Sequence, residues 1–477
     1  MKTRLHTRVA PAVLTALTLA GCALGPDYRR PDVTLPPAYA ADAAAVPAAG
    51  APTTVSPTWW RLFGDPQLDT LVDTALARNA DLLQAVARVE QAEALVRQAN
   101  AAQWPSLDLG ANAARGRTSG ATGLPGGGTV GNNFRLAAST SFELDFWGRL
   151  RRASEAARAE ALASGYAGEV VRQTVAGLVA QAYFSLRMLD EQIVLTRETL
   201  KTREEAVRLL GVRLQGGASG RLDVDQAESL RADAALQLRE LERQRSLAQS
   251  QLGLLTAQPG LELAGGRLQT LPLPPVPPAG LPSELLARRP DVRQAEQQLV
   301  SANAQIGVAK AAMFPQLSLT GLAGGESAEL SDLLKSGARI WSVGFGLTLP
   351  LFDAGRRAAQ TEQAEARQRE VVAAYQGAVH SAFKDVADAL ANLRAARESQ
   401  ADVEASEKAA LRALQVAQQR YDVGYSAYLE LLDAQRTANT ARLRTVDNRQ
   451  AQLAATVAVF KALGGGWVDP VVAASQP

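Results

Sequence analysis

The sequence predicts a mainly helical protein with a smaller membrane-type β part, built as an internal duplication. Two observations lead to this prediction. Alanine, glutamine, arginine, glutamate and leucine dominate two long stretches without proline, residues 148–258 and 351–469, and this is the composition of long helices. Directly before each stretch, apolar residues occupy every second position, as in a strand with one apolar face.

The clearer strand-to-helix junction lies at residues 347–356, with the sequence LTLPLFDAGR. Small or polar residues separate its alternating apolar positions, which are Trp341, Val343, Phe345, Leu347, Leu349 and Leu351. Pro350 has no N–H to donate and therefore ends the strand, and Asp353 can cap the start of a helix. A weaker copy lies at residues 142–149, so each long helical region begins after a strand.

The first 21 residues read as a secretory signal peptide. A basic start is followed by an apolar stretch at residues 9–19, which is too short to span a bilayer. Small residues precede Cys22, which resembles the lipobox of bacterial lipoproteins, and by this resemblance Cys22 would be lipidated and become the N-terminus. The alternative is a plain signal peptide with a chance cysteine. Because Cys22 is the only cysteine, we expect no intramolecular disulfide and no cysteine zinc site.

Charge and motifs argue against two other classes of function. The formal charge is +2, and removal of Lys2, Arg4 and Arg8 with the signal peptide leaves about −1 (+2 minus 3), without the basic bias of a nucleic-acid binder. The remaining chain has a single histidine, His380, within a helical stretch, and no nucleophile, P-loop or dinucleotide motif in a suitable setting. We therefore expect no catalysis, no cofactor and no metal.

The first half of the chain can be read in order. Residues 22–57 are rich in Pro and Ala without periodicity, so we expect an extended, lipid-anchored tether. Helical composition over residues 68–103 ends at Trp104 and Pro105, and a strand follows at residues 107–113. The Gly-rich residues 117–132 are expected to form an exposed loop, and residues 134–146 the returning strand.

The second half repeats this order. AAQWPSL at residues 101–107 matches AAMFPQL at 311–317, and Gly148-Arg149 matches Gly355-Arg356. We therefore predict two repeats, at residues 58–258 and 283–463, each with a helix, two strands and a long helical hairpin. A Pro-rich connector at residues 259–282 joins them, since the stretch 259–290 holds eight of the 23 prolines, and residues 464–477 form a C-terminal tail.

The long helices carry a coiled-coil seam. Small and apolar residues recur at alternating steps of three and four from Val372 to Tyr421, with Gln400 and Glu407 as polar interruptions. A continuous helix over residues 355–423 would be about 100 Å long at 1.5 Å per residue. That length matches a gap in the cell envelope and not a globular core.

The four predicted strands have the length, about 10 residues, and the alternation of membrane strands. No segment after the signal peptide is apolar enough for a transmembrane helix. Because unpaired strand edges cannot face lipid, the sheet must close, and four strands are too few for a barrel of at least about eight. Two, three or four chains sharing one barrel would give about 8, 12 or 16 strands, and these residues do not choose among them. The alternative is a soluble sandwich with a coiled-coil stalk.

Together these features resemble the outer membrane factor family, the TolC-like channels, and most closely its lipoprotein branch of OprM- and NodT-like efflux channels. The resemblance rests on the anchor at Cys22, on LPLFDAGRR at residues 349–357 and on RYDVGYSAYLELLDAQR at residues 420–436. It implies a homotrimer with a shared 12-stranded barrel in the outer membrane, a long α-helical barrel in the periplasm and a Pro-rich equatorial belt.

The resemblance also implies a periplasmic gate. Leu429 and Asp433 are four residues apart and share one helix face, and in the family the matching residues form the constriction. Arg436 is expected to join the nearby polar contacts. The alternative for Asp433 is a helix-start residue that favours the helix dipole. The first repeat has Asp223 and Asp225 in this region instead.

The turns beside the gate are expected to dock a periplasmic adaptor. In the second repeat the turn contains Val423, Gly424 and Tyr425. The first-repeat turn, with Gly216 and Gly217, departs from this pattern.

We therefore expect the outer membrane channel of a tripartite efflux system. It would be a passive exit duct for small toxic compounds or drugs, expelled by an inner-membrane pump of the resistance-nodulation-division type through the adaptor. The expected partners are two further copies of the chain, the adaptor, the pump and outer membrane lipid, and no nucleic acid. The alternatives are the duct of a type I protein secretion system and a structural lipoprotein that spaces the envelope.

Overall fold

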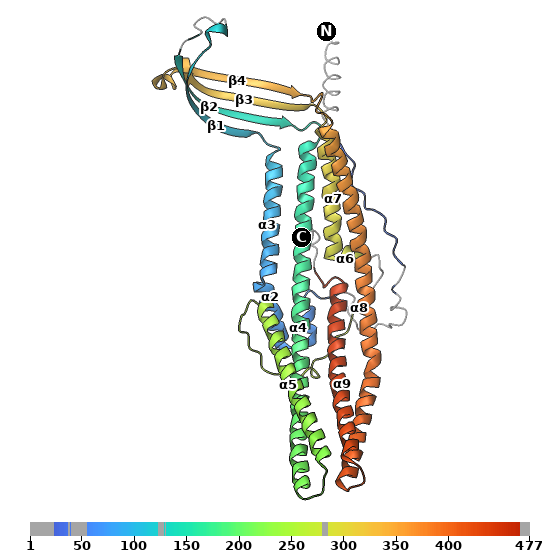
Figure 1. The fold of residues 1–477 in the computed structure, drawn as a ribbon. Coiled ribbons are helices and arrows are strands. Elements are labelled where there is room, and N and C mark those ends of the chain that lie inside the picture. Colours follow the sequence, from blue (N-terminus) through green and yellow to red (C-terminus); the bar gives the residue numbers. More distant parts are fainter. Residues whose placement is uncertain are drawn as a thin grey trace. The chain divides into compact units, whose positions relative to one another are not determined.

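A computed structural model describes residues 23–36, 39, 55–122, 128, 130–278 and 285–467 (Figure 1). The predicted signal peptide, Cys22 and residues 468–477 of the predicted tail lie outside the described residues. Two compact units are present. Unit 1 combines residues 1–32, 88–165 and 294–376, and unit 2 combines residues 33–87, 166–293 and 377–477. Each unit therefore draws on both predicted repeats.

The helices confirm the predicted duplication, because corresponding elements have the same length. Helices α3 and α7 have 22 residues, α4 and α8 have 67, and α5 and α9 have 35. The helices are α2 (Pro66–Arg78), α3 (Ala80–Ala101), α4 (Arg149–Gln215), α5 (Arg221–Leu255), α6 (Leu285–Arg288), α7 (Pro290–Ala311), α8 (Arg356–Asp422) and α9 (Tyr428–Ala462). None of the helices in the described part of the chain combines the length and apolar character needed to cross a membrane.

Unit 1 contains a four-stranded antiparallel sheet in the order β1-β2-β3-β4 (Figure 1). Its strands are β1 (Ser106–Arg117), β2 (Val130–Leu144), β3 (Gln316–Ser327) and β4 (Arg339–Thr348). The strands β1 and β2 are longer than predicted, so the loop between them is shorter than the expected residues 117–132. Within this sheet β1 and β4 are the two edge strands.

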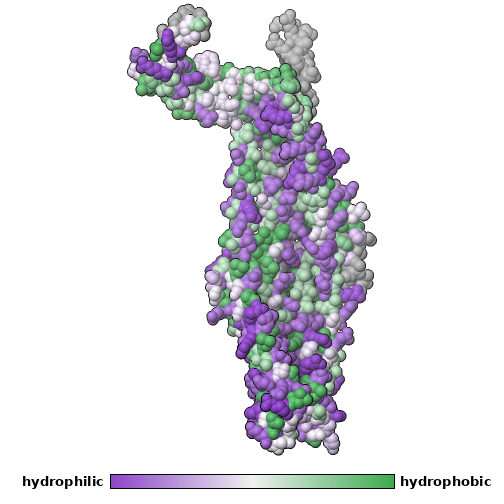
Figure 2. Space-filling view, viewed as in Figure 1, coloured by the Kyte–Doolittle hydropathy of each residue, from purple (hydrophilic) through white to green (hydrophobic). Residues whose placement is uncertain are grey.

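The strand register divides the sheet into an apolar and a polar face. Leu109 pairs with Ala138, Ala138 with Ala323, and Ala323 with Trp341, and the alternation keeps these partners on one face. We call this the apolar face; it also carries Leu107, Phe134, Leu136, Phe142, Leu144, Leu317, Leu319, Val343, Phe345 and Leu347. Most of its large side chains are exposed in the single chain, for example Trp341 at 79%. Hydrophilic residues gather at the loop end of the sheet (Figure 2).

Both strand-to-helix junctions are capped by an aspartate. The Asp145 carboxylate accepts hydrogen bonds from the backbone N–H groups of Leu150 (3.0 Å) and Arg151 (2.9 Å). The predicted cap Asp353 accepts from the N–H groups of Gly355 and Arg357. These bonds satisfy donors that the first helical turn leaves free.

The predicted helix at residues 68–103 is wrong in one respect, because it is broken at Asn79. Asn79 has an extended backbone, and its side-chain oxygen accepts from the N–H groups of Asp81 and Leu82 at the start of α3. Its side-chain amide donates to the Leu255 carbonyl, 176 residues away (3.0 Å). The second repeat has the equivalent break at Arg289, between α6 and α7.

Unit 2 has its core where the predicted packed structure begins. A 3₁₀ turn, η2 (Trp59–Phe63), buries Trp59, Trp60 and Phe63 against α4 and α9, with the Trp59 and Phe460 rings 5.7 Å apart. The predicted seam is also confirmed, since α8 buries Val379, Val386 and Leu393.

The polar interruptions of the seam have partners on α9. Gln400 accepts hydrogen bonds from Asn448 and Gln452, and Glu407 accepts one from the Thr445 hydroxyl. Gln400 and Glu407 are only half-buried, and their hydrogen bonds are satisfied, so these polar groups are tolerated in the seam.

The segment expected to be a tether is packed within unit 1 over residues 23–32, which we call the N-terminal strap. These residues have no helix or strand, as expected for an extended segment. The Leu24 N–H donates to the Trp147 carbonyl (3.1 Å), and the Asn303 side chain donates to the Pro26 carbonyl (2.8 Å). The prediction of a tether therefore needs correction for these residues.

Two features fix the strap in place. Gly25, at φ +101°, crosses α7 so closely that an added Cβ would lie 2.6 Å from the Gly307 Cα. The Arg30 guanidinium then makes two hydrogen bonds, of 2.7 and 2.9 Å, to the buried Glu296 carboxylate, which also accepts from the Tyr28 hydroxyl. Burial beside this carboxylate raises the pKa of Tyr28. The backbone of the strap is thus held against α7.

Candidate functional site at the hairpin tips

The second-repeat hairpin turns at Gly424, between α8 and α9. Gly424 has a left-handed backbone (φ +79°), which glycine adopts without the steric cost that other residues bear. The Tyr425 N–H reaches back to the Arg420 carbonyl (2.8 Å) and closes the helix end. Val423 and Tyr425 are both exposed on either side of the glycine.

The first-repeat turn has the same geometry in spite of its different sequence. Gly217 has φ +69°, and the Ala218 N–H donates to the Arg213 carbonyl at 2.8 Å. Gly216 precedes it in the position of Val423. The first turn therefore matches the second in backbone and differs in the side chains it presents.

The three predicted gate residues lie on the first turns of α9. Leu429 is 62% exposed, and Asp433 lies four residues later on the same face. The Arg436 guanidinium donates to the Asp433 carboxylate at 2.7 Å, with both side chains largely exposed. Tyr428 is the first residue of α9 and Glu430 its first-turn acid, so Asp433 lies beyond the turn where a helix-start residue would sit.

The acidic residues of the first-repeat tip have local partners. Asp223 accepts from the Ser219 hydroxyl (3.0 Å) and the Gly220 N–H (3.2 Å), and thus caps α5. Asp225 pairs with Arg221 on the same helix. Both carboxylates are therefore accounted for by contacts that stabilise the start of α5.

The two hairpins pack together near their tips. A buried cluster joins Leu210 of α4 and Ala227 of α5 to Tyr428 and Leu431 of α9. The Arg213 guanidinium also donates to the Tyr421 hydroxyl of α8 (2.8 Å). The exposed gate residues are consequently carried on a well-packed support.

Polar contacts cross from α4 to α9 above this cluster. The pairs are Gln192–Asp447 (2.6 Å), Thr199–Asn439 (3.1 Å) and Arg203–Gln435 (2.5 Å). Sequence reasoning missed them, although a signal was available for Arg203. The buried residues Leu189, Thr196, Arg203 and Leu210 follow one another at intervals of seven, so an arginine occupies a seam position.

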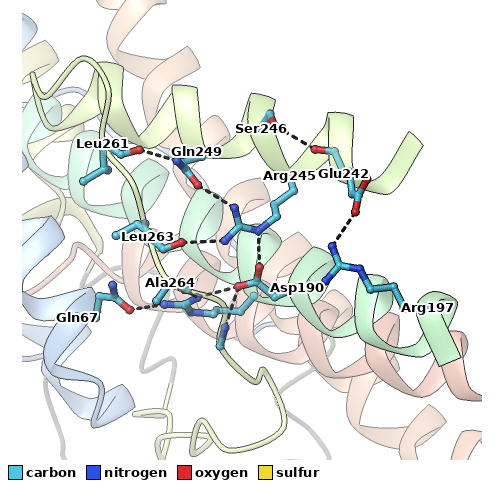
Figure 3. Close-up of polar contacts among 12 residues, drawn as sticks. Gln67, Asp190, Arg197, Glu242, Arg245, Ser246, Gln249, Leu261, Leu263 and Ala264 are labelled. Carbon is cyan, nitrogen blue, oxygen red and sulfur yellow. Dashed lines mark hydrogen bonds and ion pairs between the residues drawn. The ribbon is translucent and has the colours of Figure 1, made fainter. Parts of the chain in front are cut away.

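A second cluster that sequence reasoning missed surrounds Asp190 of α4 (Figure 3). Its carboxylate, 5% exposed, accepts from Arg187 (2.8 Å), from Arg245 of α5 (2.6 Å) and from the Gly266 N–H of the connector (3.0 Å). Arg245 also donates to the Leu263 carbonyl (2.8 Å), as Figure 3 shows. The cluster thus fixes the Pro-rich connector onto α4 and α5.

Among the residues that the structure describes, no group of three or more His, Cys, Asp or Glu side chains is arranged so that it could hold a metal ion.

The family model of outer membrane efflux proteins matches residues 71–258 and 281–465, one match in each half. The chain belongs to the outer membrane efflux protein family. It is 35% identical to the cation efflux system protein CusC of Escherichia coli over 95% of this chain and 97% of that protein. It is also 35% identical to the probable outer membrane lipoprotein SilC of Salmonella typhimurium, over 96% and 98% of the two chains.

Among solved structures, the CmeC outer membrane channel of Campylobacter jejuni superposes with a TM-score of 0.88 and 28% identity, over 94% of this chain and 96% of that one. These matches confirm the predicted TolC-like fold, the family and the outer membrane location.

Proposed function

We propose that this protein is the outer membrane duct of a tripartite system that expels small toxic compounds. An inner-membrane pump of the resistance-nodulation-division type would supply the energy, and a periplasmic adaptor would join pump and duct. The relative CusC is named for cation efflux. The choice of small toxic compounds as the solutes of this protein is therefore itself part of the proposal.

The observation that carries the proposal is the apolar face of the sheet in unit 1. Most of its large side chains are exposed in the single chain, and the edge strands β1 and β4 have unpaired outer edges in this sheet. In lipid, such edges must be paired, so copies of the chain would close a common barrel with the apolar face outward. Three copies, as the resemblance implies, would give about 12 strands.

Aromatic residues support this placement of the sheet. Trp104 precedes β1, Phe146 follows β2, Phe314 precedes β3 and Phe352 follows β4, and all four side chains are exposed. Membrane barrels carry rings of aromatic residues where the strands meet the water interface. One rim of the barrel would therefore lie at the strand-to-helix junctions.

We also propose that Cys22 is acylated. The N-terminal strap would then hold the lipid near the β2–α4 junction, since the Leu24 N–H is bonded to the Trp147 carbonyl only two residues after Cys22. A single acyl chain binds a membrane weakly, so the barrel and not the lipid would make insertion permanent. Cys22→Ala should leave some inserted protein, whereas a free Cys22 thiol on the mature protein would contradict acylation.

The gate proposal assigns closure of the periplasmic end to Leu429, Asp433 and Arg436. In a trimer, three Asp433 carboxylates would gather around the axis, where they repel one another and attract cations. Each chain already holds one partial counter-charge, because Arg436 contacts its own Asp433. Adaptor docking at the turns around Gly217 and Gly424 would open the tip by separating the hairpins.

Gene deletion followed by growth on a panel of toxic compounds tests this function. An efflux duct predicts increased sensitivity to several small compounds, with no loss of secreted proteins. Loss of a secreted protein with unchanged sensitivity would favour the type I secretion alternative. A protein that gives no conductance in planar bilayers would favour the structural, envelope-spacing alternative.

A further inference from the structure

Four arginine side chains are buried among the described residues, and one of them differs from the rest. Arg152, Arg187 and Arg289 each contact at least one carboxylate, at 2.6–2.9 Å. Arg203, only 5% exposed, has no carboxylate in contact. Its hydrogen bond of 2.5 Å goes to the neutral side-chain amide of Gln435. Burying a charge without a counter-charge costs free energy, so we expect a group that compensates the charge of Arg203.

Arg203 lines a cavity between α4, α8 and α9. The cavity has a volume of about 160 Å³, which is sufficient for a small ion and some water. Its walls also include Gln435, Asn439 and Thr199. Because the Gln435 oxygen accepts from Arg203, the amide nitrogen of Gln435 remains a donor. The cavity therefore combines a fixed cation with neutral polar groups.

The charged groups near the cavity do not neutralise Arg203. At its rim, the Glu198 and Arg442 side chains lie 3.9 Å apart, are substantially exposed and offset each other. Asp433 of α9 pairs with Arg436. Burial is the main cause that lowers the pKa of Arg203, and the group that opposes this effect is the Tyr428 hydroxyl, not a carboxylate. The buried end of the cavity is thus positively charged.

We propose that this cavity binds a small inorganic anion, with chloride as the physiological ligand, directly on the Arg203 guanidinium. The anion would accept hydrogen bonds from Arg203 and from the neighbouring side-chain amides, and it would supply the missing counter-charge. Because Arg203 belongs to α4 and Gln435 to α9, the bound anion joins the two hairpins. Its contact on α9, Gln435, lies two residues after the proposed gate residue Asp433. This binding site does not depend on the proposed transport function.

The duplication provides a natural comparison. The residue of α8 that corresponds to Arg203 is Ala410, which is also buried. An uncharged residue is therefore compatible with a long-helix seam at this position, and the arginine is not required by the packing of the repeat. Arg203→Met is accordingly a reasonable variant for removing the charge.

Two measurements on the full-length protein test the site, with Gln435→Glu as a matched variant that supplies an internal carboxylate. In crystals soaked in bromide, anomalous scattering should place bromide beside Arg203. In thermal unfolding at constant ionic strength, replacing gluconate by chloride should raise the midpoint saturably. Both signals should be absent in Gln435→Glu and in Arg203→Met.

Three results would overturn the proposal. Absence of bromide beside Arg203 in the wild-type protein is the first. A carboxylate from a neighbouring copy in contact with Arg203 is the second, since it would identify the counter-charge as a protein group. A chloride-dependent rise of the same size in wild type, Gln435→Glu and Arg203→Met is the third, because it would place the anion elsewhere.

Discussion

At the residue scale, left-handed glycines end both long helices. Gly217 and Gly424 occupy corresponding positions, and each is followed by an N–H that closes the last turn. The equal backbone geometry explains how two turns of different sequence can both sit at a hairpin tip. It also means that the side chains around each glycine, and not the turn itself, distinguish the two repeats.

Gly424→Ala should destabilise the tip by about 1 kcal/mol, because alanine in the left-handed region meets a steric cost. Gly377→Ala is the matched control. Gly377 lies within α8 with no heavy atom within 4 Å of an added Cβ, so this change should stabilise by about 0.5–1 kcal/mol. Chemical denaturation measures both. Equal effects of the two substitutions would contradict the assigned backbone of the turn.

Arg30→Ala should destabilise the protein by about 1–3 kcal/mol, since it leaves the buried Glu296 carboxylate without the two hydrogen bonds from the Arg30 guanidinium. The adjacent Arg29 is exposed, and Arg29→Ala should change stability by less than about 0.5 kcal/mol. Thermal unfolding of the purified protein compares the two variants. If Arg30→Ala behaves like Arg29→Ala, the strap is not held by this ion pair.

The contacts of a residue could be predicted from the sequence only where its partners lie close to it in the chain. Leu429 and Asp433 share a face because of helix spacing alone, so their juxtaposition was predictable. Asp190 accepts one hydrogen bond from the connector and Glu296 accepts hydrogen bonds from the strap, and these two segments have no periodicity to place them. The sequence marks Arg203 only as a charged residue at a seam position. Its lack of a counter-charge can be recognised only in the packed structure.

At the element scale, the sheet register turns four separate alternating patterns into one apolar face. Alternation was readable in each strand, but the pairing of Leu109 with Ala138 and of Ala323 with Trp341 was not. The break at Asn79 shows that the end of a single helix can also be set by a contact that the local sequence does not reveal. Local composition favoured a continuous helix, and the deciding bond goes to Leu255, which is distant in sequence.

Phe345→Arg should reduce assembly into membranes, at a cost of about 2–4 kcal/mol if the residue lies near the bilayer midplane. Ser342→Arg, on the polar face of the same strand, is the control and should assemble. Gly344, on the same polar face, is a less suitable control, because an added Cβ would lie 2.8 Å from the Thr320 hydroxyl. Heat-modifiable migration of outer membrane fractions measures assembly, and equal loss in both variants would reject the division into faces.

For the whole molecule, the boundary between the two repeats does not coincide with the boundary between the two compact units. Each unit takes corresponding segments from both repeats, so neither repeat forms a compact unit by itself. The helices α4 and α8 run from the strand-to-helix junctions to the tip turns, about 100 Å at 1.5 Å per residue. In sequence, each of these helices follows a membrane-type strand and precedes a tip turn.

We propose that this protein is a gated duct, and single-channel recording of the purified full-length protein distinguishes a gated duct from a closed or structural assembly. We predict cation-preferring conductance that increases in the Leu429→Ala/Asp433→Ala variant and loses part of its cation preference. The control is Leu222→Ala/Gln226→Ala at the corresponding positions of the first repeat, which should leave selectivity unchanged. Absence of conductance would contradict the duct, and unchanged conductance and selectivity in the Leu429→Ala/Asp433→Ala variant would contradict the gate.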